Sequence, residues 1–101
     1  MASDDTVTIT HEARGEGGRY LARVEGEAHK GHLDWEPTDR ANARIATHTI
    51  VPPEIGGRGV AGKLVDQLIA DARQQDFRIV AQCSYVASKF DQNPDWADLR
   101  A

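Results

Sequence analysis

The sequence predicts an α/β fold of the α+β type, a mixed sheet of about five strands with one main helix and a short C-terminal helical segment. Segments in which apolar and polar residues alternate come first. A segment with an amphipathic helical pattern follows them, and a nearly all-apolar strand comes after it. The expected order is β-β-β-β-α-β-α, an antiparallel meander and one right-handed βαβ crossover. With 101 residues, 40% hydrophobic and 28% charged, we expect a single domain over residues 1–101.

Four strands are expected before the helix, over residues 6–13, 19–25, 28–35 and 44–51. Apolar and polar residues alternate in the first three, as in strands with one buried face. Glu25-Gly26-Glu27 is a tight hairpin signal between the second and third. The fourth is apolar and rich in threonine, which suits a central strand. Pro52-Pro53 ends it, because proline cannot donate to a ladder.

The helix is expected from Val60, where the hydrophobic period becomes helical. Its apolar stripe is formed by Val60, Leu64, Val65, Leu68, Ile69 and Ala72, and its water-facing side by Lys63, Asp66, Gln67, Asp71 and Arg73. Residues 77–83 form a nearly all-apolar strand, which predicts cover on both faces. Ser84 is expected to cap a short helix through Phe90, and Asn93-Pro94-Asp95 to start a last helical turn.

Charge and composition narrow the function classes. Twelve basic and sixteen acidic residues give a net charge of −4, which argues against nucleic acid as a partner and mildly favours a cationic substrate such as an amine. No apolar run approaches the roughly 20 residues that cross a bilayer, so no membrane contact is expected. The polar start over residues 1–5 does not resemble a secretory signal. A single cysteine, Cys83, suits a reducing cytoplasm.

The most informative stretch is the glycine-rich turn between the fourth strand and the helix, Gly56-Gly57-Arg58-Gly59. Glycines let the backbone approach a ligand closely with its N–H groups exposed. The helix that follows adds unpaired N–H groups and the positive end of its dipole. The sequence therefore predicts an anion site at this turn, of the kind that most often binds phosphate.

Two nucleotide motifs overlap this turn, and both fit poorly. Gly57 to Gly62 matches the dinucleotide pattern G-x-G-x-x-G, but two prolines separate it from its strand and the next strand ends without an acid for a ribose. Gly57 to Lys63 matches G-x-x-x-x-G-K, but Leu64 stands where a P-loop needs Ser or Thr for magnesium. An NAD site is rejected and an ATP site remains a distant alternative.

A third interpretation covers most of the chain. The segments His48-Thr49-Ile50-Val51-Pro52-Pro53-Glu54, Gly57-Arg58-Gly59-Val60-Ala61, Cys83-Ser84-Tyr85-Val86 and Asn93-Pro94 together resemble the GNAT superfamily of N-acetyltransferases, in particular its very short members. Gly56 departs from the Arg or Gln that usually begins the superfamily's loop, so the resemblance implies the backbone cradle there but not a side-chain contact. The long helices that follow the first strand in larger members are missing, so the acceptor site should be open or differently built.

The resemblance implies an acetyl-CoA site. The turn from Gly56 to Ala61, which includes Gly57, Gly59 and Val60, would hold the pyrophosphate, and Gly62 would allow its close approach. Arg58 would add charge to a phosphate or stand exposed in the turn. Ile50 and Val51 would pair their backbone with the pantetheine amides, and the fourth and fifth strands would splay apart around the thioester.

Three residues are candidates for catalysis. Cys83 would lie where the fifth strand meets the thioester, at a place where short members carry a cysteine; it is a nucleophile, an acid or base, or a small buried residue. His48, on the same strand face as Ile50, is a base or a packed strand histidine. In the superfamily a tyrosine at the place of Tyr85 often protonates the leaving thiolate; the alternative is an aromatic lid.

The predicted function is acetyl transfer from acetyl-CoA to a primary amine. Glu54, His32, Asp34 and Glu36 are candidates for the acceptor side, or solvated surface. His29 and His32 lack a further ligand of fitting spacing, so no metal is expected. The alternative is a non-catalytic module that senses acyl-CoA or binds a protein. A protein lysine, a polyamine, an amino acid or an antibiotic amine all fit as the acceptor, and a monomer or a homodimer is compatible with the chain.

Overall fold

Five strands form one sheet in the order β1-β2-β3-β4-β5 in the computed structural model, which describes residues 6–40 and 42–101. They are β1 (Val7–Arg14), β2 (Gly17–Val24), β3 (Lys30–Pro37), β4 (Ala43–Ile50) and β5 (Arg78–Ala81). The first four are antiparallel neighbours, and β5 runs parallel to β4. The predicted meander and mixed sheet are therefore confirmed. The acidic start over residues 1–5, on which the expectation about a secretory signal rests, lies outside the described residues.

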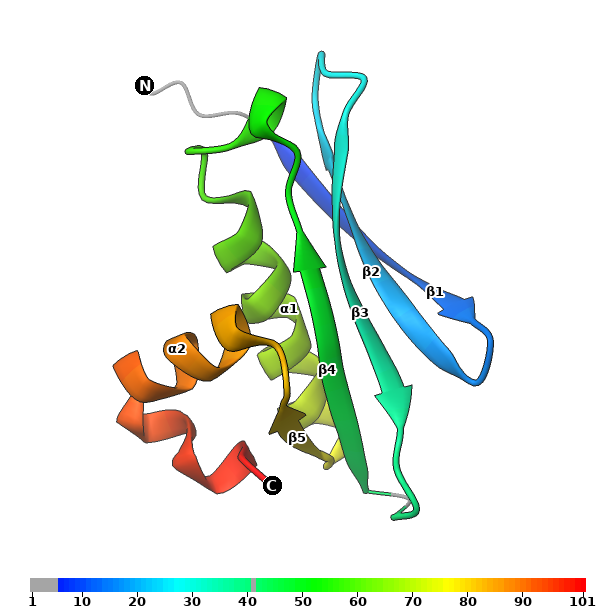
Figure 1. The fold of residues 1–101 in the computed structure, drawn as a ribbon, viewed down its shortest axis with the longest axis vertical. Helices are drawn as coiled ribbons and strands as arrows, with labels where there is room; N and C mark the ends of the chain where they lie inside the picture. The colour runs from blue at the N-terminus through cyan, green and yellow to red at the C-terminus, as the bar shows by residue number, and fades with distance from the viewer. Residues whose placement is uncertain (1–5, 41) are drawn as a thin grey trace.

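The helical elements lie on one side of the sheet. The helix α1 (Val60–Gln75) connects β4 to β5 after a 3-10 turn, η1 (Pro53–Ile55), and the helix α2 (Ser84–Gln92) and a second 3-10 segment, η2 (Pro94–Leu99), follow β5. In Figure 1, α1 lies behind the sheet, and α2 and η2 lie beside β4 and β5. Within residues 6–40 and 42–101, no helix is long and apolar enough to span a membrane.

The core forms between α1 and the sheet, as the sequence predicts. All six residues of the predicted apolar stripe of α1 are buried. They share one cluster with Tyr20, Leu33 and Ile79 from the sheet and with Val86 and Phe90 from α2. Burying a full aliphatic or aromatic side chain contributes about 1.5–3 kcal/mol, so this cluster is the main source of stability.

One residue on the predicted water-facing side of α1 is buried instead. Asp71 is 9% exposed, and its carboxylate accepts hydrogen bonds from Tyr20 Oη at 2.7 Å and from Gln67 Nε2 at 3.0 Å. Burial of a carboxylate is tolerated when donors satisfy its oxygens. The prediction for Asp71 is wrong because its partner Tyr20 lies 51 positions away in sequence.

Element ends also differ from the prediction. The fifth strand covers Arg78–Ala81 instead of residues 77–83, and its burial is mixed, so it is not covered on both faces. Its pairing with β4 stops at Ala81, opposite Ala46. Cys83, in place of Ser84, is the residue that precedes the first turn of α2. The early end of β5 follows from its departure from β4 after Ala81, which a continuous apolar run does not reveal.

Candidate functional site

The glycine-rich turn has the backbone shape that an anion site needs. Gly57 has φ 75° and Gly59 has φ 74°, in the left-handed region that side chains disfavour. A Cβ built on either one would meet nothing within 4 Å, so backbone conformation and not crowding requires glycine there. Ile55, fully buried, anchors the turn to the core. The turn is therefore held from one side and open on the other.

The N-terminus of α1 supplies the donors. Gly59 precedes the helix with no side-chain cap, and the first intrahelical bond runs from Lys63 N–H to Gly59 O, at 3.1 Å. The N–H groups of Val60, Ala61 and Gly62 come before that bond and point out of the helix end. With the positive end of the helix dipole, they suit a phosphate group.

Arg58 turns toward the neighbouring hairpin. Its Nη1 lies 3.2 Å from Glu27 Oε2, which follows β2. The Arg58 side chain is 33% exposed, so the pair is partly screened by solvent. The predicted contribution of Arg58 to a phosphate site thus stays a prediction, and the backbone donors of α1 do not depend on it.

The strands β4 and β5 separate beside this turn. Their pairing ends with Ala46 opposite Ala81, and one further link runs from Cys83 N–H to Ala46 O, at 2.9 Å. Gln82 N–H bonds back to Val80 O at 3.0 Å, a tight turn that takes the chain away from β4. β4 itself continues to Ile50, paired there only with β3. The result is a splay with a free strand edge, which matches the arrangement implied by the resemblance.

A β-bulge fixes which side chains of β4 face which way. Ala46 is opposite Trp35 and His48 is opposite Asp34, so Thr47 is the extra residue between them. Because an inserted residue reverses the alternation of faces, Thr49, opposite Leu33, faces α1. His48 and Ile50 then face away from α1, together on one face as predicted.

Cys83 lies at the base of the splay. Its Sγ is 3.4 Å from Thr49 Oγ1 across the gap. Burial raises the pKa of the Cys83 thiol, but the Thr49 hydroxyl and the backbone N–H groups of Val86, Tyr85 and Thr49 stabilise the thiolate, and the net pKa lies below its ordinary value. The donors come from the free edge of β4 and from the N-terminus of α2, and both favour the thiolate.

Tyr85 lies between the two helix N-termini. It sits in the first turn of α2, and its Oη would be 3.8 Å from a Cβ built on Gly62 in α1. The tyrosine hydroxyl thus reaches the first turn of α1, beside the amides described above. The structure thus places the Tyr85 hydroxyl beside the first turn of α1, and Cys83 lies two positions before Tyr85.

The face of the sheet opposite α1, called here the open face, carries His48. It consists of alternating residues of β1 to β4, and among its members on β2, β3 and β4 are Arg19, Leu21, Arg23, His32, Asp34, His48 and Ile50. His48 and Ile50 are exposed. The structure therefore separates His48 from Cys83, because β4 lies between the face that carries His48 and the face that carries Thr49 and Cys83.

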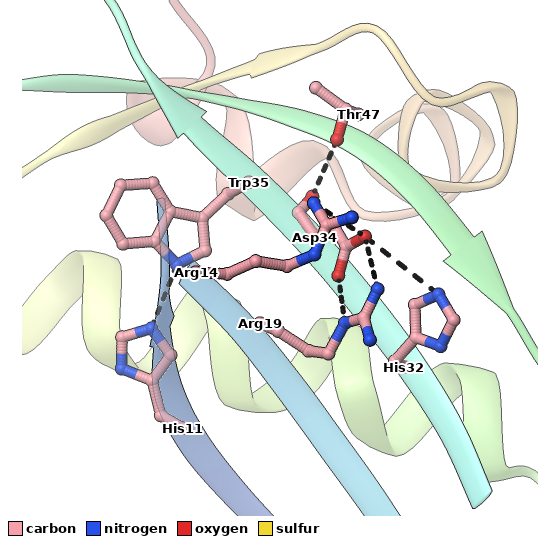
Figure 2. A network of polar contacts seen from close by, with 7 residues as sticks. All are labelled: His11, Arg14, Arg19, His32, Asp34, Trp35 and Thr47. Atoms are coloured by element: carbon pink, nitrogen blue, oxygen red, sulfur yellow. Dashed lines mark hydrogen bonds and ion pairs between the residues drawn. The ribbon is translucent and has the colours of Figure 1, made fainter. Parts of the chain in front are cut away.

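Asp34 is buried on the open face, beneath the side chains around it (Figure 2). Arg19 donates to both of its oxygens, at 2.7 and 3.0 Å; Arg14 Nη1 and His32 Nε2 lie 3.6 and 3.9 Å away. Burial raises the pKa of Asp34. The Arg19 hydrogen bonds and the charges of His32, Arg19 and Arg14 lower it by more than burial raises it, so the net pKa is below its ordinary value. Thr47 Oγ1 donates to Asp34 O at 3.3 Å, so this network also fastens the bulge.

The sequence did not predict the place of Thr49, and it predicted another role for Asp34. Thr49 is visible in the sequence only as part of the segment from His48 to Glu54, and nothing in one strand reveals that a bulge turns it toward Cys83. Asp34 was a candidate for the acceptor side, and the structure shows its carboxylate engaged by Arg19. Glu54 lies 3.9 Å from His29 and Glu36 is exposed. Among the described residues, no group of three or more His, Cys, Asp or Glu side chains could hold a metal ion.

A family model described as GCN5-related N-acetyl-transferase matches residues 19–99. The chain belongs to this family. The match runs from β2 to η2 and so includes the glycine-rich turn, the splay and Cys83. Membership supports an acetyltransferase-type function for the chain.

The residues at the splay fit the coenzyme that such acetyltransferases generally use. Three N–H groups at the start of α1, belonging to Val60, Ala61 and Gly62, are available to a pyrophosphate. The edge of β4 beyond Ala46 has no β5 partner, so the backbone groups that point to this edge are available to the amides of pantetheine. The absence of a side chain on Gly62 leaves room beside the Tyr85 hydroxyl.

Proposed function

We propose that this GCN5-related protein is an acetyl-CoA-dependent N-acetyltransferase that acts on a primary amine. One observation carries the proposal: the Cys83 thiol lies at the splay of β4 and β5, and Tyr85, two positions later, reaches the uncapped N-terminus of α1. The thiol is a reactive group where a thioester carbon would lie, and the helix N-terminus is an anion site. Binding acetyl-CoA is the chemistry that requires both together.

The coenzyme side of the site is built largely from backbone. The N–H groups of Val60, Ala61 and Gly62 bind the pyrophosphate, and the left-handed Gly57 and Gly59 hold the turn open around it. Ile50 and Val51 pair with the pantetheine and orient the thioester carbonyl toward the splay. The backbone N–H groups of the site are fixed in place before the reaction. They therefore stabilise the negative charge that develops on the thioester oxygen without reorganisation.

The acceptor amine approaches from the open face. An alkylammonium has a pKa near 10.4 and is unreactive until it loses a proton. His48 is exposed on that face beside the free part of β4, and it accepts this proton directly or through water. Tyr85 gives a proton to the departing coenzyme thiolate from the other side of β4.

Cys83 acts as a thiolate in this scheme. Donors from Thr49, Tyr85 and Val86 lower the pKa of the thiol, which favours a nucleophile or a base over an acid. As a nucleophile it takes the acetyl group from coenzyme A and passes it to the amine. As a base it takes the amine proton in place of His48. The first route gives two-step exchange kinetics, and the second requires both substrates to be bound at once.

The test is turnover of acetyl-CoA with a panel of amines, with coenzyme A release followed by chromatography. We expect acetylation of at least one amine and a loss of about 100-fold or more in kcat with Cys83→Ala, and a smaller loss with His48→Gln. Arg73→Gln is the matched control. It removes an exposed charge on α1 that is paired with Asp98, and it should leave kcat unchanged. Full turnover in the Cys83→Ala, His48→Gln double variant would contradict the assignment of these residues.

A non-catalytic acyl-CoA sensor is the second candidate. It is favoured by the separation of His48 from Cys83 and by the open acceptor face. A sensor would bind acetyl-CoA with a saturable rise in thermal stability and would acetylate no amine in the panel. A ligand at 100 times its Kd adds about 2.7 kcal/mol to the free energy of unfolding.

A further inference from the structure

We propose that Thr49 is the positioning residue of the site: its hydroxyl holds Cys83 at the splay and donates to the sulfur when the thiol ionises. This inference rests on the proposed function, because it takes Cys83 to be the reacting group. It adds a residue on β4 whose side chain acts through the thiol and not on substrate directly.

The geometry of the bulge is the first support. Thr47 is the extra residue between Ala46 and His48, and it reverses the alternation of β4 above that point. In a regular strand His48 would share the face of Ala46 and point toward the thiol. With the bulge, Thr49 takes that place and the imidazole goes to the open face. The bulge thus selects a hydroxyl, and not an imidazole, as the partner of Cys83.

The contact itself is the second support. Cys83 Sγ and Thr49 Oγ1 are 3.4 Å apart, within hydrogen-bonding range for sulfur, and the residues are 34 positions apart in sequence. A neutral thiol donates weakly to the hydroxyl. A thiolate has no proton to donate, so the hydroxyl rotates and becomes the donor, and such charge-assisted bonds are the stronger kind.

The groups around the sulfur are neutral donors. The N–H groups of Tyr85, Val86 and Thr49 act on the thiol together with the Thr49 hydroxyl. The titratable side chains nearest in sequence point elsewhere: His48 on β4 projects from the opposite face, and Tyr85 on α2 turns its hydroxyl toward Gly62. The other charged side chains on these two elements have partners of their own: Arg44 the rings of Trp35 and Phe77, Lys89 the ring of Tyr85, and Asp91 the guanidinium of Arg100. Thr49 is the side-chain donor in this set, and so it is the member that substitution can remove.

A further feature explains why the sulfur stays at the splay. Cys83 N–H bonds to Ala46 O, which fixes the backbone of residue 83 against the last paired position of β4. The side chain then extends along the free edge toward Thr49. The thiol therefore takes the place that a continuing β5 would occupy, and Thr49 fixes where along this edge the sulfur lies.

The test measures the thiol without any substrate. The rate of Cys83 alkylation by iodoacetamide, followed by mass spectrometry from pH 5 to 10, gives the midpoint of thiol ionisation. Thr49→Val, which keeps the shape and removes the hydroxyl, should raise this midpoint by about 0.5–1 pH unit and slow alkylation at pH 7 about 3- to 10-fold. Thr49→Ser should restore the wild-type midpoint.

Thr47→Val is the matched control, because its hydroxyl donates to Asp34 O and not to sulfur. It should leave the midpoint unchanged, with circular dichroism showing that each variant is folded. An unchanged midpoint in Thr49→Val overturns the proposal. An equal shift in Thr47→Val also overturns it, because the effect would then come from the bulge and not from the hydroxyl.

A second readout connects Thr49 to the reaction. If amine acetylation is observed, the acidic limb of the kcat profile in Thr49→Val should move by the same amount as the alkylation midpoint, with KM for acetyl-CoA unchanged. A shifted midpoint with an unshifted kcat profile overturns the catalytic part of the proposal. Absence of turnover in the wild type defeats the proposed function instead, and the alkylation experiment still decides the role of the Thr49 hydroxyl.

Discussion

The two halves of β4 differ in what surrounds them. Residues 44–46 pair with β3 on one edge and with β5 on the other, and the guanidinium carbon of Arg44 lies between the rings of Trp35 and Phe77, at 4.1 and 3.9 Å from their centroids. Beyond the bulge at Thr47, residues 48–50 pair with β3 and not with β5, and Ile50 is 52% exposed. One strand thus contributes a core element in its first half and a ligand-binding edge in its second. Binding sites draw on the less stabilised parts of a fold, because free backbone groups are what a ligand uses.

The largest change in the free energy of unfolding is expected from a substitution in β5, the strand that pairs with the first half of β4. Ile79 in β5 is fully buried, and Ile79→Ala should lower the free energy of unfolding by about 3 kcal/mol. Ile50→Ala is the matched change in the splayed half and should alter it by less than about 0.5 kcal/mol, because the side chain is already exposed. Urea denaturation measures both. Equal losses would mean that the splayed half is packed as tightly as the paired half.

The next effect acts at the boundary between the halves. Asp34→Asn should cost about 2 kcal/mol, because it removes the charge that Arg19 contacts through two hydrogen bonds. The folded pKa of Asp34 is below its unfolded value, so the carboxylate stabilises the fold fully above about pH 4. That contribution is lost as the pH falls through the folded pKa. Urea denaturation from pH 3 to 7 should show the difference between wild type and variant shrinking at the acidic end; a constant difference would contradict this.

The smallest effects on stability fall in the glycine-rich turn. Gly59→Ala should cost about 1 kcal/mol because φ is positive there. Gly62→Ala lies inside α1, has room for the methyl group and should stabilise the helix by about 0.5–1 kcal/mol. If α1 binds the pyrophosphate, Gly62→Ala should nevertheless weaken acetyl-CoA binding. Thermal denaturation with and without acetyl-CoA separates the two effects, and unchanged binding would remove Gly62 from the site.

The sequence predicted those features that depend on neighbours along the chain. The stripe from Val60 to Ala72 follows a helical period, and the end of β4 follows from Pro52-Pro53, so both are read locally. The pairing of Asp71 with Tyr20 and the bulge opposite Asp34 and Trp35 depend on residues far apart in sequence. A single strand carries no sign of where its partner gains or lacks a residue.

The residues of the candidate site also differ in whether one segment of the sequence is enough to locate them. The glycine-rich turn and Cys83 were found because glycine spacing and a lone cysteine are visible in one segment. The placement of His48 away from the thiol, and of Thr49 against it, needed the register of β3 and β4. One extra residue in β4 reverses the faces of both relative to Ala46, and a single strand does not show that this residue is there.

The most direct test of the central claim is a titration of the isotopically labelled protein with coenzyme A, followed through backbone amide resonances. A coenzyme site at the splay predicts saturable shifts at Val60, Ala61 and Gly62 and along the free edge of β4 from Thr49 to Val51. Resonances of Arg23 and Lys30, which are paired on the open face, should stay in place. No saturable shift, or shifts confined to the open face, would contradict a coenzyme site at the splay of β4 and β5.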